Sequence, residues 1–197
     1  MPVIPDRPDP GPIRLVNLIG ESVSAYTLEN ASLDQIALQS ERHGLREQAM
    51  LDDVYNKRIL SLAANIPLLQ RLPSPDATAR AHSKLCGSTV TVDVTMKGDV
   101  VSGFGHEVKA CALGQASSSI MASHVVGSTA DELREVREQA RAILKENAAP
   151  PDGKWADLAV LVPVRDFKAR HASTMLTFDA VVDAIDQIEA KRREAAV

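Results

Sequence analysis

Apolar and polar residues alternate in the middle of the chain. Between Val90 and Met96 every second side chain is apolar, and the intervening residues are threonines and one aspartate. This period of two predicts a strand with one buried face. The glycine in the next segment, residues 97–99, can adopt the positive φ that a tight turn requires. Since a second apolar run covers residues 100–108, we predict a β-hairpin.

Apolar residues at three- and four-residue spacing predict helices on both sides of this hairpin. Their predicted ranges are 51–63, ending before Pro67, then 113–126, 130–146 and 173–196. Thr129 is the predicted N-cap of the third helix, because Glu132 follows three residues later in a capping box. Leu158–Val164 is predicted as a third, buried strand, and Leu72–Lys84, which contains two prolines, as a loop.

This order of elements predicts an α+β fold, in which helices pack on one face of a small, mainly antiparallel three-stranded sheet. The folded domain is expected to cover residues 50–197, with Met50 as a candidate native start. Residues 1–12 contain five prolines, which exclude a helix or a central strand there. We therefore expect residues 1–49 to be a poorly ordered extension that is dispensable for the domain, with one short helix over Leu33–Arg46.

Composition and charge narrow the classes of function. The net charge of −4 gives no basic footprint for nucleic acid. The longest apolar run, Leu158–Val164, is far too short to span a bilayer, and the N-terminus lacks the basic segment and apolar core of a secretory signal. Two cysteines in 197 residues do not form a disulfide framework. We therefore expect a cytoplasmic protein without a membrane or nucleic-acid partner.

The two cysteines flank the predicted hairpin. Cys86 precedes its first strand and Cys111 follows its second, so antiparallel pairing predicts two neighbouring thiols at one end of the hairpin. Cys111 also stands just before a predicted helix, whose dipole favours the thiolate that binds metal or attacks sulfur. The pair is a half-site suited to zinc or iron. The alternative is that both are small buried residues that act only as hydrophobes.

Three segments carry a resemblance to a known family. Cys86-Gly87 stands before the alternating strand, residues 110–121 have the sequence Ala-Cys-Ala-Leu-Gly-Gln-Ala-Ser-Ser-Ser-Ile-Met, and residues 164–178 align without a gap to a late family motif. Together they resemble the U-type iron–sulfur cluster scaffold family, and most closely its NifU-like and SufU-like branch. The resemblance covers roughly residues 50–190. It implies a SufE/NifU-like sandwich fold and a scaffold function that is not enzymatic.

The resemblance also implies a set of site residues. The family motifs are Cys-Gly-Asp, Cys-Ala and Arg-x-x-Cys-Ala-x-Leu-x-Trp, so Cys86 and Cys111 match two of the cysteines. Ser88 stands at the family's aspartate and Ser173 at its third cysteine. Hydroxyls stay protonated near neutral pH and are poor metal ligands. His171, two residues before Ser173, is an additional candidate ligand because its imidazole can supply a nitrogen.

The implied function is that of a scaffold. Such a protein receives sulfur from a cysteine desulfurase, binds iron, assembles an iron–sulfur cluster of the 2Fe–2S type and hands it to acceptor proteins. The two serines leave two alternatives open. One is a non-catalytic adaptor that kept the fold and lost the cluster, and the other is a zinc-dependent sulfur acceptor in which Cys111 takes a persulfide. Analysis of bound metal and acid-labile sulfide distinguishes the three.

Overall fold

The computed structural model describes residues 15–16, 22–23 and 57–196. The chain divides into two units, Met1–Leu51 and Asp52–Val197. In the first unit, β1 (Leu15–Val16) pairs antiparallel with β2 (Ser22–Val23). The helix predicted over Leu33–Arg46 lies outside the described residues, as does most of the extension that we expect to be poorly ordered.

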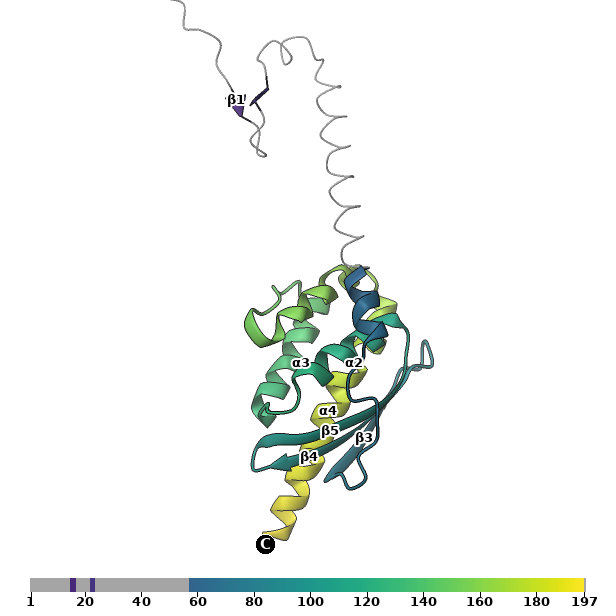
Figure 1. Cartoon of the computed structure of the whole chain (residues 1–197), viewed down its shortest axis with the longest axis vertical. Coiled ribbons are helices and arrows are strands. Elements are labelled where there is room, and N and C mark those ends of the chain that lie inside the picture. Colours follow the sequence, from purple (N-terminus) through teal and green to yellow (C-terminus); the bar gives the residue numbers. More distant parts are fainter. Residues whose placement is uncertain (1–14, 17–21, 24–56, 197) are drawn as a thin grey trace, which may run out of the picture. The chain divides into compact units, whose positions relative to one another are not determined.

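The second unit contains a three-stranded antiparallel sheet in the order β3-β4-β5. Its strands are β3 (Ala77–His82), β4 (Thr89–Lys97) and β5 (Val100–Lys109). β4 and β5 form the predicted hairpin, and Gly98 turns the chain with a φ of 63°. The valines of β4 that were expected on the buried face are fully buried. The predicted α+β fold with an antiparallel three-stranded sheet is therefore confirmed (Figure 1).

The third strand of the sheet is not the predicted one. Leu158–Val164 lies in η2 (Gly153–Asp166), a 3-10 helix with Pro163 inside it, so the strand prediction there is wrong. A short apolar run fits a buried helical turn as well as a strand, and Pro163 has no N–H to donate to a central ladder. The third strand is β3, within the predicted loop Leu72–Lys84. Its two buried positions are alanines, whose low β-propensity hid the alternation.

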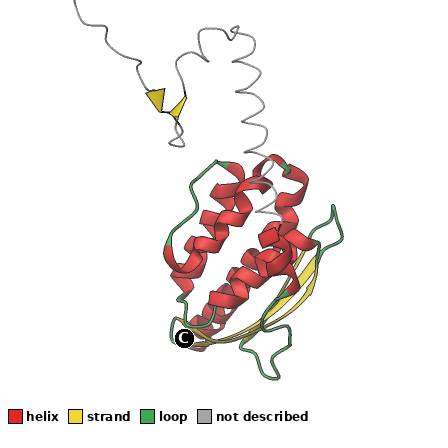
Figure 2. Ribbon diagram, turned by 45° about the horizontal axis from the view of Figure 1, so that its top comes forward, coloured by secondary structure: helices red, strands yellow, loops and turns green. Residues whose placement is uncertain are grey.

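Helices lie on one face of this sheet, as predicted (Figure 2). Besides a helical segment over residues 57–64, they are α2 (Ala112–His124), α3 (Ala130–Lys145) and α4 (Lys168–Ala195). The predicted cap of α3 is present, because the Glu132 N–H donates to Thr129 Oγ1 over 3.2 Å. The part of the first predicted helix before residue 57 lies outside the described residues. In the part of the chain that the structure describes, no helix is long and apolar enough to cross a membrane.

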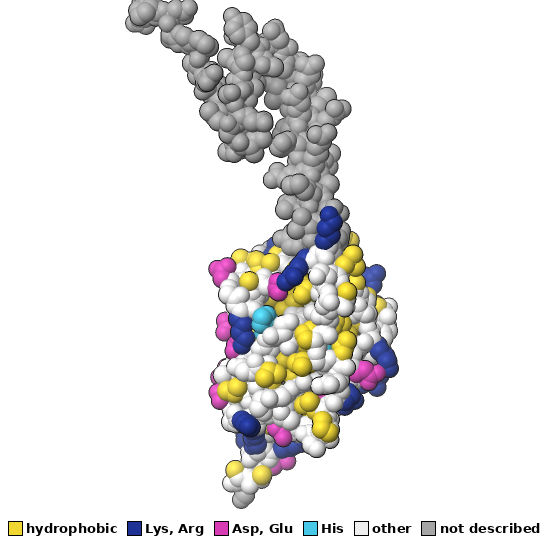
Figure 3. All heavy atoms as spheres, viewed as in Figure 1, with side chains coloured by type: hydrophobic (Ala, Val, Ile, Leu, Met, Phe, Trp, Pro, Cys, Tyr) yellow, Lys and Arg dark blue, Asp and Glu magenta, His cyan; other side chains and the backbone are white. Residues whose placement is uncertain are grey.

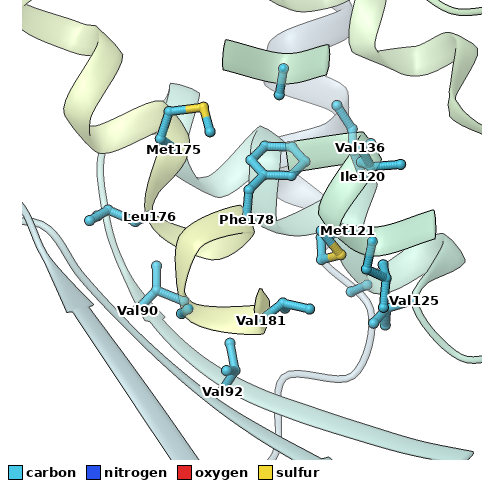
Figure 4. Close-up of a cluster of buried hydrophobic side chains, with 14 of the residues drawn as sticks. Val90, Val92, Ile120, Met121, Val125, Val136, Met175, Leu176, Phe178 and Val181 are labelled. Carbon is cyan, nitrogen blue, oxygen red and sulfur yellow. The ribbon is translucent and has the colours of Figure 1, made fainter. Parts of the chain in front are cut away.

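α4 is the central element of the core. It contacts the sheet through β3 and β4 and the other helices through α2 and α3. Figure 4 shows Phe178 and Val181 of α4 among the valines of β4 and the apolar side chains of α2, and both residues are fully buried. Burial of this apolar surface, at about 25 cal/mol per Å², holds α4 against the hairpin. This packing fixes the position of the N-terminal turns of α4 relative to the residues that precede β4 and the residues that follow β5.

The surface of the second unit mixes charges of both signs. Figure 3 shows Lys and Arg side chains close to Asp and Glu side chains on the viewed face, with apolar side chains between them. Arg134 pairs with Asp186 and Glu189 at 2.6 and 2.8 Å, which links α3 to α4. Among the described residues, six large apolar side chains are exposed, namely Leu60, Leu68, Leu69, Leu85, Val126 and Phe167.

Residues 65–72, here called the strap, cover the free edge of β5. The His106 N–H donates to Leu68 O over 3.2 Å, and His106 Nε2 lies 2.9 Å from Pro67 O. The strap passes so close to Gly105 that a Cβ there would stand 2.2 Å from Gln70 O. A covered edge strand cannot pair with a strand of another molecule, so the strap protects the sheet from edge-to-edge association.

Asp93 anchors the end of the strap on the polar face of the sheet. Its carboxylate is fully buried and accepts hydrogen bonds from the Arg71 guanidinium at 2.6 and 2.8 Å, from the Thr78 hydroxyl at 2.6 Å and from the Leu72 N–H at 2.9 Å. Burial alone would raise the pKa of Asp93, but these donors bring that pKa below its ordinary value. Every acceptor position of this buried charge is therefore used within the fold.

Candidate metal site

Three segments that are far apart in the sequence meet at one end of the hairpin. They are the β3–β4 loop with Ser83, Cys86 and Ser88, the N-terminus of α2 with Cys111, and the second turn of α4 with Ser173. The Ser83 N–H donates to Ser88 O and the Gly87 N–H donates to Ser83 O, both over 2.9 Å. Gly87 has a φ of 70°, which most side chains disfavour. The loop is therefore closed by its own backbone, and it presents Cys86 at its tip.

Cys86 is exposed, and two buried hydroxyls lie beside its sulfur. Its Sγ is 3.4 Å from Ser83 Oγ and 3.0 Å from Ser88 Oγ. Hydrogen bonds from the Ser83 hydroxyl, from the hydroxyl and N–H of Ser88, and more weakly from Ser173 lower the pKa of the Cys86 thiol to about 7, against the opposing effect of burial. A large fraction of Cys86 is therefore thiolate at neutral pH, the form that binds metal and attacks sulfur.

Cys111 is the N-cap residue of α2, and a single residue separates it from the end of β5. Its thiol donates to Ser173 Oγ over 3.6 Å, and the Ser173 hydroxyl in turn donates to Arg170 O over 2.9 Å. Cys111 is half-buried, whereas Ser173 is fully buried. The hydroxyl of Ser173 therefore interacts with both thiols, directly with Cys111 and more weakly with Cys86.

A glycine allows α4 to come this close to Cys111. A Cβ at Gly114, in the first turn of α2, would stand 3.0 Å from Ser173 O. One turn later, Ser118 Oγ and Thr177 Oγ1 share a hydrogen bond of 2.5 Å between α2 and α4. The small residues of α2 thus let the two helices pack closely, and that packing places Ser173 beside Cys111.

The structure brings together the four positions that the family motifs assign to the site, namely Cys86, Ser88, Cys111 and Ser173. Ser83 is a fifth member that sequence reasoning missed. Its only local signal is its place three residues before Cys86. No periodic pattern in the sequence identifies Ser83, because its hydroxyl lies beside the sulfur of Cys86 only in the closed loop.

His171, the additional candidate ligand, does not join this group. Its Nε2 lies 3.2 Å from Val164 O and 3.0 Å from Arg165 O, at the end of η2. Because carbonyl oxygens only accept hydrogen bonds, Nε2 carries a proton. Residues two apart on a helix point in different directions. Ser173 therefore faces the thiols while His171 lines a separate surface hollow.

One chain offers an incomplete donor set for iron or zinc. Among the described residues, no group of three or more His, Cys, Asp or Glu side chains could hold a metal ion. A tetrahedral iron or zinc site needs four donors. Here the two thiols are accompanied only by neutral hydroxyls, which are poor ligands. The site is a pair of cysteine side chains, one exposed and one half-buried, with serine hydroxyls beside both sulfurs.

Comparison with known proteins identifies the family. No family model matches the chain. The solved structure of a nitrogen-fixing NifU-like protein (N-terminal) from Brucella abortus is 61% identical, with a TM-score of 0.69, and the match covers 72% of this chain and 99% of that chain. The chain belongs to the NifU-like family. The resemblance inferred from the three sequence segments is therefore confirmed.

Two more distant proteins agree with this assignment. The NifU-like chain is 22% identical over 136 residues to the iron–sulfur cluster assembly scaffold protein IscU of Thermotoga maritima, a match that covers 68% of this chain and 94% of that protein. It shares its fold, with a TM-score of 0.60 at 18% identity, with a candidate iron–sulfur cluster assembly scaffold protein for the SUF system from Fervidobacterium islandicum AW-1; the match covers 65% of this chain and 93% of that chain. These relatives bear the names of iron–sulfur cluster scaffolds.

Proposed function

We propose that this NifU-like chain is an iron–sulfur cluster assembly scaffold, which binds iron and a nascent cluster through Cys86 and Cys111 and hands the cluster to acceptor proteins. One observation carries the proposal: the two thiols lie at one site of a NifU-like fold and both interact with the Ser173 hydroxyl. Cysteine thiolates are the usual ligands of iron–sulfur clusters. The cluster is the cargo of this function, and the role is not enzymatic.

The finer parts of the proposal concern the cargo and the partners. The cluster is of the 2Fe–2S type, its sulfur comes from a cysteine desulfurase, and the acceptors are iron–sulfur proteins of the cytoplasm. The family resemblance supports each of these. The exposure of Cys86 supports the proposed transfer of sulfur from a partner, because a sulfur at the surface is accessible to a donor protein.

A second, related role as a sulfur acceptor is favoured by the lowered pKa of the exposed Cys86 thiol. The Cys86 thiolate can attack the outer sulfur of a persulfide on a donor protein. A new S–S bond then forms at Cys86 while the donor leaves as a thiolate, so no external oxidant is required. The sequence pointed to Cys111 for this role, whereas the environment of Cys86 supports Cys86.

Anaerobic reconstitution tests the proposal. The purified chain is incubated with ferrous iron, cysteine and a cysteine desulfurase, then desalted and assayed for iron, acid-labile sulfide and zinc. Iron with sulfide supports the scaffold, zinc alone supports the zinc-dependent sulfur acceptor, and the absence of all three supports the adaptor.

Three variants locate the site. We expect Cys86→Ser and Cys111→Ser each to lose most of the bound iron and sulfide while circular dichroism shows an intact fold. Ser102→Ala, on an exposed position of β5, is the matched control and should load like the parent. Parental loading in both cysteine variants would exclude these thiols as ligands.

A further inference from the structure

The two outer strands of the sheet differ in what covers their free edges. β4 is the central strand, so β3 and β5 each have one edge without a neighbouring strand. The edge of β5 is bonded near both ends, because Val101 exchanges hydrogen bonds with the backbone of residues 127–128 and the His106 N–H donates to Leu68 O of the strap. Among the described residues, no hydrogen bond reaches the outer edge of β3.

Every second residue of β3 points its backbone groups toward this edge. The Ser83 N–H, directly after the strand, donates across the strand pair to Ser88 O over 2.9 Å. Because the direction of the backbone groups alternates along an antiparallel strand, the N–H and C=O groups of Thr78, Arg80 and His82 point away from β4. They form a row of donors and acceptors without partners in the described part of the chain, which is what an incoming strand requires.

The charge on β3 favours an acidic strand as its neighbour over a second copy of β3. The strand has the sequence Ala-Thr-Ala-Arg-Ala-His, and its polar side chains are exposed on the outer face of the sheet. Two copies of β3 paired edge to edge would bring their Arg80 side chains close together, and like charges on neighbouring strands are unfavourable. An extended segment with Asp or Glu opposite Arg80 forms a favourable cross-strand pair instead.

A hollow beside β3, on the same outer face, is also lined by cations. Its volume is about 370 Å³, and it is lined by Arg71, Arg80 and Lys109 together with Glu107 and three threonines. Glu107 pairs with Lys109 at 2.7 Å, whereas no described carboxylate forms an ion pair with Arg80. Lys109 lowers the pKa of Glu107, and Arg71 and Arg80 lower it further. The surroundings of β3 therefore favour negative charge.

We propose that β3 is a docking edge for an extended, acidic segment of a partner protein, which adds a strand to the sheet. The backbone of this segment pairs with Thr78, Arg80 and His82, and its carboxylates lie toward Arg80 and the cationic hollow. In this mode of binding the main-chain hydrogen bonds give affinity and the alternate side chains give specificity. Because Ser83 follows β3 directly and its hydroxyl lies 3.4 Å from Cys86 Sγ, the bound segment ends beside the loop that carries the exposed thiol.

A peptide titration followed by NMR tests the docking edge. The probe is the synthetic peptide acetyl-Thr-Glu-Val-Glu-Val-Glu-Thr-amide, added to the full, isotope-labelled chain. In the free chain the amides of Arg80 and His82 should exchange quickly with solvent, whereas pairing with β4 protects those of Ala79 and Ala81. We expect the peptide to protect the Arg80 and His82 amides and to shift their resonances. Binding that leaves these amides unprotected, or no binding at millimolar peptide, overturns the inference.

Two matched peptides separate the contribution of the backbone from that of the charge. In one, a pair of prolines replaces the central Glu-Val, which removes N–H groups that a ladder requires. In the other, lysine replaces every glutamate. We expect each to bind at least about tenfold more weakly than the probe. Equal binding of the proline peptide would show that no strand is added, and equal binding of the lysine peptide would show that charge does not select the segment; either result contradicts the inference.

Substitutions in β3 locate the docking edge on the chain. Arg80→Glu reverses the charge, and His82→Pro removes an outward N–H without touching the ladder to β4; each should weaken peptide binding at least about tenfold. Lys97→Glu, at an exposed cation at the other end of the sheet, is the matched control and should bind like the parent. Circular dichroism checks that each variant is folded. Parental binding by both β3 variants would exclude β3 as the site. Anaerobic cluster loading of Arg80→Glu without peptide should stay parental, so a failure of docking leaves the scaffold function in place.

Discussion

Two polar clusters, one within β4 and one at its start, differ in how their groups are satisfied. Asp93, in the middle of β4, is fully buried and accepts four hydrogen bonds from Arg71, Leu72 and Thr78. Cys86, just before β4, is exposed and has neutral serines as neighbours. A buried charge with a full set of donors stabilises the fold. An exposed thiolate without a cation as partner remains available to a ligand.

The lowered pKa values of these two groups therefore have different meanings. The Asp93 carboxyl is kept ionised, against its burial, by the Arg71 guanidinium and by hydrogen bonds that exist only in the folded chain. The Cys86 thiol is kept partly ionised by the Ser83 and Ser88 hydroxyls and the Ser88 N–H. Because structural ion pairs shift pKa values as well, a shifted pKa points to a candidate functional site where the group also lies within reach of a ligand. Cys86 meets this condition and Asp93 does not.

The largest effect on stability should come from Asp93→Ala. The substitution leaves the Thr78 hydroxyl and the Leu72 N–H without their acceptor beneath the strap. We expect a loss of about 2–4 kcal/mol in the free energy of unfolding, because hydrogen bonds to a charged group contribute roughly 1.5–3 kcal/mol each and water can replace only part of them for the exposed Thr78 and Arg71 side chains. Urea denaturation followed by circular dichroism measures it.

Asp99→Ala is the matched control for Asp93→Ala. Asp99 is an exposed aspartate in the β4–β5 turn, and its replacement should change the stability by less than about 0.5 kcal/mol. Equal effects of the two substitutions would show that Asp93 contributes no more to the free energy of unfolding than an exposed aspartate does.

A smaller loss is expected for Gly105→Ala, which tests the contact between the strap and β5. The new Cβ would stand 2.2 Å from the backbone oxygen of Gln70, so the strap has to move. Overpacking of this kind costs about 1–3 kcal/mol, which urea denaturation would detect. Since the strap does not contribute to the thiol site, cluster loading of the folded variant should stay parental. A parental unfolding midpoint would show that the strap is not held as described.

The fold is predictable where a side-chain pattern has one explanation. The valines of β4 alternate with polar residues, and Gly98 turns the chain, so the hairpin follows from the sequence. The alanines of β3 carry no such signal, because that strand is stabilised by its pairing with β4, which is a long-range term. Leu158–Val164 has the apolar content of a buried strand but forms η2, since periodicity alone cannot separate the two.

The next smaller expected effect on stability is a dependence on pH that is caused by His106. Burial lowers the pKa of His106 below its ordinary value of 6.5, although the hydrogen bond to Pro67 O opposes this. Below about pH 6.5 the unfolded chain therefore binds a proton that the folded chain does not. The stability that depends on neutral His106 is present above that pH and is lost as the pH falls, by at most about 1.4 kcal/mol per pH unit.

Urea denaturation between pH 7 and pH 5 measures this slope. We expect His106→Gln to reduce it, because the amide does not titrate. His82→Gln, at an exposed position of β3, should keep the slope of the parent. If His106→Gln keeps the whole slope as well, other groups account for the loss of stability.

Of the residues at the site, only the two cysteines are predictable from the local sequence. Ser173 lies 62 residues from Cys111, and only the spacing of the family's late motif connects them. His171 was a reasonable candidate as long as the helix was expected to begin at Ser173. Because α4 begins at Lys168, His171 lies within the helix, and its direction differs from that of Ser173. Side-chain direction is therefore what the sequence could not supply.

The smallest effect, and the most specific to the site, concerns the reactivity of Cys86. With a pKa of about 7, the rate of alkylation by iodoacetamide in a Cys111→Ser background should reach half of its maximum near pH 7, because only the thiolate reacts.

Three substitutions test which groups stabilise the Cys86 thiolate. Ser83→Ala removes the largest contribution to the lowered pKa and should move this midpoint toward the ordinary value of 9.0. Ser88→Ala should move it less, since the Ser88 N–H remains, and Ser102→Ala should not move it. Each substitution should change the stability by no more than about 1 kcal/mol, so the reactivity reports the sulfur and not the fold. A midpoint near pH 9 in the parent would mean that the serines do not stabilise the thiolate, and the contrast with Asp93 would then be lost.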